Sequence, residues 1–72
     1  MTQLRFHHDV YSTVALDEAI EVFKDHGELT RSEKLPYYEV EVSAPEGTDE
    51  AELAGEFGNY VLALTVEEKR EA

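Results

Sequence analysis

The sequence contains no cysteine and no tryptophan. Without cysteine, the chain can form neither a disulfide framework nor a thiolate metal site. It also has no apolar run of about eighteen residues, the length that a membrane-spanning helix needs. The first residues, MTQLRFHHD, lack the apolar core of a secretory signal. We therefore expect a cytoplasmic protein that does not span a membrane.

Basic residues are scarce as well. Six Lys and Arg stand against seventeen Asp and Glu, which gives a formal net charge of −11. Nucleic-acid backbones and anionic membranes are bound through clustered Lys and Arg, so the composition argues against both. An acidic surface is typical of a well-solvated protein, including one from a salt-adapted organism. The alternative is that this surface meets a basic patch on a partner protein.

The length of 72 residues suffices for one small domain, residues 1–72, whose single core barely supports folding. A partner, or a second copy of the chain in a homodimer, would add buried surface. After residue 64 the apolar pattern stops, so residues 65–72 are predicted to form a fraying tail. The predicted core comprises Leu4, Phe6, Val10, Leu16, Ala19, Ile20, Phe23, Leu29, Tyr38, Val40, Val42, Leu53, Phe57, Tyr60, Val61 and Leu64.

Residues 49–64 are predicted to form an amphipathic helix, because apolar side chains recur there at helical spacing. Asp49, followed by Glu52 three residues later, predicts a capping box at its start, and Thr48 is a second candidate cap. Gly55 and Gly58 lie inside the pattern and cost roughly 1 kcal/mol each relative to alanine. We therefore expect tertiary packing to hold this helix.

A first helix is predicted between residues 12 and 27. Ser12 or Thr13 can cap its start, and Gly27 fits the left-handed position that ends many helices. Its apolar stripe comprises Leu16, Ala19, Ile20 and Phe23.

Three strands are predicted at residues 3–10, 28–32 and 37–43, with a turn at residues 33–36. The order of elements favours an α+β fold with two layers, β-α-β-β-α, in which a small three-stranded sheet has two helices on one face. The other face would carry polar side chains into water, namely Arg5, His7, Asp9, Glu39 and Glu41.

The histidines are the first candidates for a metal site. On a strand, neighbouring side chains point to opposite faces, so His7 and His8 are not expected to bind the same ion. The paired carboxylates of the two helices lie on predicted outer faces, away from any cleft that could separate their pKa values. We therefore predict no metal, no cofactor and no enzymatic activity. An enzyme or metal carrier that uses His7, His8 or His26 is the competing hypothesis.

Four segments together resemble one family. They are FHHDVYS, LDEAIEVF, YYEVEV and EFGNYVL, and their order is similar to that of HxsD, the small protein of His-Xaa-Ser radical-SAM peptide-modification systems. Residues 56–62 look like the family's E-F-x-N-x-hydrophobic-Leu signature. The resemblance implies a non-enzymatic accessory protein of ribosomal-peptide modification, whose partner is a radical-SAM maturase, its precursor peptide or both. The family's last helix usually continues through a basic, apolar segment, whereas this chain continues as VEEKREA.

Partner-binding residues are predicted at Tyr37, Asn59, Leu62 and Val66. Tyr37 lies opposite the inward-facing Tyr38, and exposed tyrosine is a common interface anchor. Asn59 either hydrogen-bonds a neighbouring loop or contacts a partner's backbone. Partners could add a strand to a sheet edge or dock on the second helix. The alternative function is a small acidic subunit or inhibitor of another protein complex.

Overall fold

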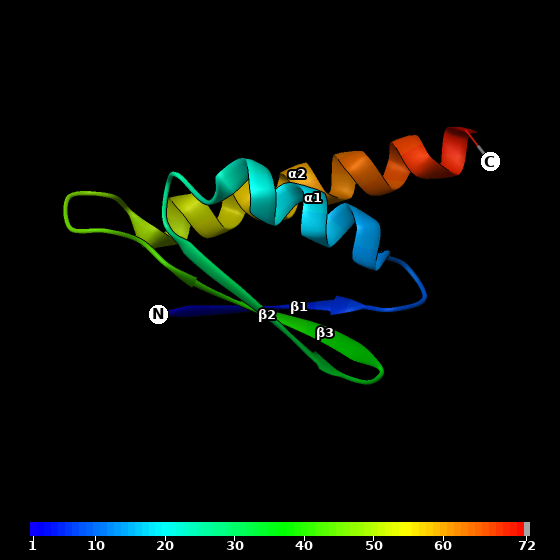
Figure 1. The fold of residues 1–72 in the computed structure, drawn as a ribbon, viewed down its shortest axis with the longest axis horizontal. Helices are drawn as coiled ribbons and strands as arrows, with labels where there is room; N and C mark the ends of the chain where they lie inside the picture. Colours follow the sequence, from blue (N-terminus) through cyan, green and yellow to red (C-terminus); the bar gives the residue numbers. More distant parts are fainter. Residues whose placement is uncertain (72) are drawn as a thin grey trace.

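The computed structural model describes residues 1–71, and in it two helices cover one face of a three-stranded antiparallel sheet (Figure 1). The predicted α+β architecture is therefore confirmed. No helix within residues 1–71 is long and apolar enough to cross a bilayer. The elements are β1 (Thr2–His7), α1 (Thr13–Phe23), β2 (Glu28–Lys34), β3 (Tyr37–Ser43) and α2 (Glu50–Glu71).

The last strand in sequence, β3, is the central strand of the sheet. Val40 lies opposite Leu4 on β1 and opposite Arg31 on β2. β1 and β2 are consequently the two edge strands, and each has a single neighbour. The sequence predicted the strands but not this order.

The core lies between the sheet and the helices, around the ring of Phe57. Phe6 and Phe23 meet this ring edge to face, with centroid distances of 6.1 and 5.6 Å. The buried apolar side chains come from β1, β3 and both helices, namely Phe6, Ala15, Leu16, Ala19, Val40, Val42, Leu53, Ala54, Phe57 and Val61.

One predicted core residue, Val10, is 45% exposed, so that prediction is wrong. The reason is that β1 ends at His7 instead of continuing to Val10. The backbone amides of Val10 and Tyr11 both donate to the carbonyl of His7 at 3.0 Å, which closes a turn. Tyr11 then packs against the core, with its ring 5.0 Å from that of Phe6.

Helix α1 begins as predicted, because the Ser12 hydroxyl accepts a hydrogen bond from the Ala15 amide at 3.1 Å. The interpretation of Gly27 as a left-handed helix end is wrong, since only Gly47 has a positive φ among the described residues. Gly27 is needed for close packing instead. A Cβ there would lie 2.8 Å from the side chain of Leu53 and 2.8 Å from the carbonyl of Ser43.

Helix α2 begins at the predicted cap, where the Asp49 carboxylate accepts from the Glu52 amide at 3.2 Å. The predicted tail is wrong for residues 65–71, which continue the helix, while residue 72 lies outside the described residues. Thr65 is buried, and its hydroxyl donates to the carbonyl of Val61 at 2.8 Å. Thr65 is thus a polar residue on the inner face of α2, and its hydroxyl is satisfied. Because it is polar, the apolar pattern of the sequence did not reveal that the helix continues past residue 64.

Candidate interaction surfaces

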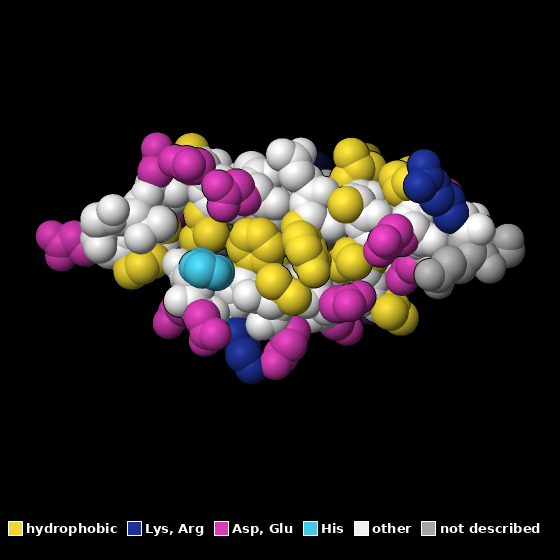
Figure 2. Space-filling view, turned by 90° about the horizontal axis from the view of Figure 1, so that it is seen from above, with side chains coloured by type: hydrophobic (Ala, Val, Ile, Leu, Met, Phe, Trp, Pro, Cys, Tyr) yellow, Lys and Arg dark blue, Asp and Glu magenta, His cyan; other side chains and the backbone are white. Residues whose placement is uncertain are grey.

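A shallow groove runs between the two helices on the side away from the sheet. It has a volume of about 470 Å³. Figure 2, which looks onto the helices, shows a row of hydrophobic side chains along the middle with acidic side chains on both sides. This surface offers apolar contact together with negative charge. Its lining includes the apolar side chains of Val22, Phe23, Leu53 and Tyr60 and the acidic side chains of Glu52 and Glu56.

Three of the predicted partner-binding residues lie on the exposed side of α2. Leu62 and Val66 are 47% and 43% exposed, although both are large and apolar. Asn59 is also exposed, and among the described side chains it makes no hydrogen bond. The structure therefore shows no bond from Asn59 to a neighbouring loop, and contact with a partner stays a prediction.

The two glycines of α2 have no packing role within the described structure. A Cβ at Gly55 or at Gly58 would meet no atom within 4 Å. Each glycine weakens the helix by roughly 1 kcal/mol relative to alanine. Alanine at either position would enter open space.

Tyr37 does not join this surface, because it lies on the open face of the sheet. It is 36% exposed, and its ring is in contact with two neighbours from β1. The His7 ring meets it edge to face at 5.3 Å, and the Arg5 guanidinium lies 5.4 Å from its centroid. The structure therefore brings Asn59, Leu62 and Val66 together and places Tyr37 on the opposite side of the molecule.

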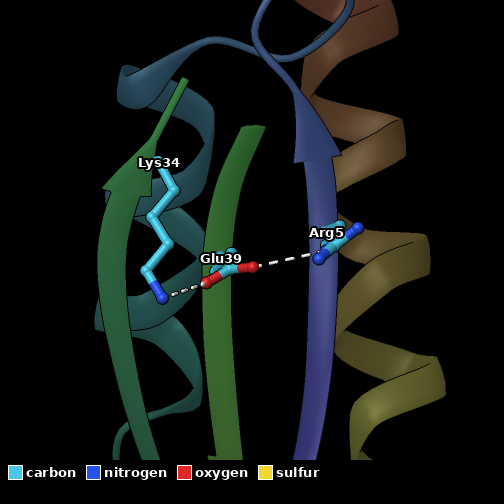
Figure 3. A network of polar contacts seen from close by, with 3 residues as sticks. All are labelled: Arg5, Lys34 and Glu39. Carbon is cyan, nitrogen blue, oxygen red and sulfur yellow. Dashed lines mark hydrogen bonds and ion pairs between the residues drawn. The ribbon is translucent and has the colours of Figure 1, made fainter. Parts of the chain in front are cut away.

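Glu39, expected in water, is buried on the open face, with an exposure of 5%. It lies on the central strand between cations from both edge strands (Figure 3). Its carboxylate is 3.3 Å from Nε of Arg5 and 3.4 Å from Nζ of Lys34. Alternation along β3 predicted the face correctly but not the burial, which depends on β3 being the middle strand.

The prediction that His7 and His8 point to opposite faces is wrong as well. His8 follows the last residue of β1, and the chain turns there. The two imidazoles are stacked, with ring centroids 5.2 Å apart and planes 17° apart. His26 lies elsewhere, in the groove between the helices, with its ring 6.1 Å from that of Phe23.

Glu50 joins the start of β1 to the start of α2. Its carboxylate lies 2.9 Å from the amino group of Met1 and accepts from the Thr2 hydroxyl at 2.7 Å. Hydrogen bonds from the amino group and from this hydroxyl hold the pKa of Glu50 below its usual value. At the end of α1, the hydrogen bond and charge of Glu21 raise the pKa of Lys24.

The buried polar groups are satisfied. No buried side-chain nitrogen or oxygen atom within the described residues lacks a hydrogen-bond partner. The groove therefore presents apolar and acidic surface without an orphaned polar group aimed into it. Comparison with protein families, curated proteins and solved structures found no match for this chain.

Proposed function

We propose that this chain is a non-enzymatic accessory protein that binds a partner through its helix layer. As the resemblance to HxsD implies, the partner is a radical-SAM peptide maturase or its precursor peptide. Two separate features of the helix layer support this proposal, namely the groove and, on the outer side of α2, the exposed apolar side chains of Leu62 and Val66. Exposed apolar surface of this kind is typical of protein-binding sites.

The groove favours an amphipathic segment of a partner. Apolar side chains of such a segment would pack on Phe23 and Tyr60, and basic side chains would lie beside Glu52 and Glu56. Opposite charges would steer association and set the orientation of the bound segment. With a net charge of −11, nucleic acid and anionic membrane are not proposed as partners. We place the complex in the cytoplasm.

Co-expression with the maturase and precursor peptide, followed by native mass measurement, tests the proposal. A complex retained at low and moderate salt is the expected result. Val22→Asp in the groove and Leu62→Asp on the outer side of α2 test the two parts of the surface, and each should weaken the complex at least tenfold if its part contacts the partner. Both positions are exposed, so the melting temperature should change little. Tyr37→Ala, on the opposite side of the molecule, is the matched control and should leave binding unchanged.

Failure to retain either protein at both salt concentrations would contradict the proposal. The alternative, an acidic subunit or inhibitor of another complex, predicts a different pattern. Its binding to a basic partner would fall steeply with added salt and would be insensitive to Leu62→Asp.

A further inference from the structure

We propose that His7, His8 and Asp9 form a binding site for Zn²⁺ or a similar divalent transition-metal ion. The three residues are consecutive, and each offers one ligand atom to a group whose members all lie within 4.8 Å of one another. His8 and Asp9 line a hollow with Thr65, Glu68 and Lys69 of α2, and this hollow shares no residue with the groove between the helices. The site therefore does not depend on a partner bound in that groove.

The backbone holds the three residues in a defined turn. The amide of His8 donates to the carbonyl of Pro36 at 2.9 Å, which ties the turn to the loop between β2 and β3. On the other side, the amides of Val10 and Tyr11 both bond the carbonyl of His7. The ligands are therefore attached to a backbone that is fixed at both ends, which reduces the entropy lost on binding.

The donor atoms lie close to, and in part slightly beyond, the separations found around a single ion. Nδ1 of His8 lies 3.4 Å from one carboxylate oxygen of Asp9, and Nδ1 of His7 lies 3.9 Å from the other. Around a tetrahedral ion with bonds of about 2.0–2.2 Å, ligand atoms are about 3.3–3.6 Å apart. The three side chains are each at least one-third exposed, so small side-chain rotations can bring their donor atoms to the distances that one ion requires.

The donor set selects the class of ion. Two imidazoles with one carboxylate suit Zn²⁺ and its neighbours in the first transition row, whereas Mg²⁺ and Ca²⁺ prefer oxygen ligands alone. Three protein ligands leave a coordination position for water or for a group of another molecule. Binding through Nδ1 of His7 must displace the hydrogen bond that this atom accepts from the Asp9 amide at 3.2 Å.

Calorimetric titration of the full chain with Zn²⁺, prepared without a polyhistidine tag, tests the site. One ion per chain is expected, with no comparable binding of Mg²⁺. His8→Gln and Asp9→Asn should each weaken Zn²⁺ binding at least tenfold. His26→Gln removes the histidine outside the cluster and should leave the affinity unchanged.

Thermal unfolding gives an independent measurement, because an ion that binds only the folded state raises the melting temperature. Zn²⁺ should raise it for the unaltered chain and for His26→Gln, but not for His8→Gln. The absence of stoichiometric Zn²⁺ binding would overturn the proposal. So would unchanged affinity in His8→Gln, or a loss in His26→Gln as large as that in His8→Gln.

Discussion

The two faces of the sheet are built from the same three strands but are stabilised in different ways. On the covered face, Val40 and Val42 pack against the helices and are fully buried. On the open face, Glu39 is buried by two cations whose own side chains are largely in water. The covered face depends on apolar area, which many side chains share. The open face depends on a few specific partners.

The largest expected effect comes from the covered face. Phe57→Ala removes the ring at the centre of the core and should lower the free energy of unfolding by about 3–5 kcal/mol. Leu62→Ala, on the exposed side of the same helix, should change it by less than about 0.5 kcal/mol. Urea unfolding at neutral pH measures both. Equal losses of stability in Phe57→Ala and Leu62→Ala would contradict the assignment of Phe57 to the core and of Leu62 to the exposed side of α2.

On the open face, Glu39→Gln leaves the side chain in place and removes its charge. We expect a loss of about 1–2 kcal/mol, because two ion pairs disappear but both cations remain solvated. Glu41→Gln on the same strand and face is the matched control, since Glu41 is exposed and should change stability little. If Glu39→Gln lost as much stability as Phe57→Ala, the open face would contribute as much as the covered face, which would contradict this comparison.

The outer face of α2 extends the comparison through two glycines. Gly55→Ala should stabilise the chain by about 0.5–1 kcal/mol, because its Cβ enters open space and alanine favours helix. Gly27→Ala should destabilise it, because its Cβ would lie 2.8 Å from the Ser43 carbonyl and from Leu53. The same substitution therefore has opposite signs at two positions, which denaturant unfolding of both variants measures.

The smallest expected effect is the change in stability with pH that Glu50 causes. Because the pKa of Glu50 is lowered in the folded state, its contribution is present above the ordinary pKa of a glutamate and is lost as the pH falls through the lower folded value. Glu50→Gln should therefore be less stable than the unaltered chain at pH 7, and the difference should shrink at low pH. Glu46→Gln is the control, since Glu46 is exposed and makes no ion pair within the described residues. A difference that persists below the folded pKa would contradict this account.

Local patterns in the sequence predicted what depends on nearest neighbours along the chain. The apolar stripe around Phe57, the Ser12 cap and the boundaries of β3 are all of this kind. Glu39 was missed because its burial depends on strand order, which periodicity does not contain. The pairing of His7 with His8 was missed because it depends on where β1 ends.

The exposed apolar side chains of the candidate interaction surface were predicted in part for the same reason. Exposure of Leu62 and Val66 follows from their place on the helix opposite the core, which helical spacing contains. The groove between α1 and α2 requires two helices to lie side by side, and no single segment specifies that contact.

The Ser12 hydroxyl links the start of α1 to the last turns of α2. It accepts from the Ala15 amide at the start of α1 and donates to the Glu68 carboxylate in the last turns of α2 at 2.8 Å. Opening of those turns would release the hydroxyl that orders the start of α1. Their amides should therefore exchange with solvent together with those at the start of α1, as one cooperative unit, and not at the rates of independently fraying helix ends.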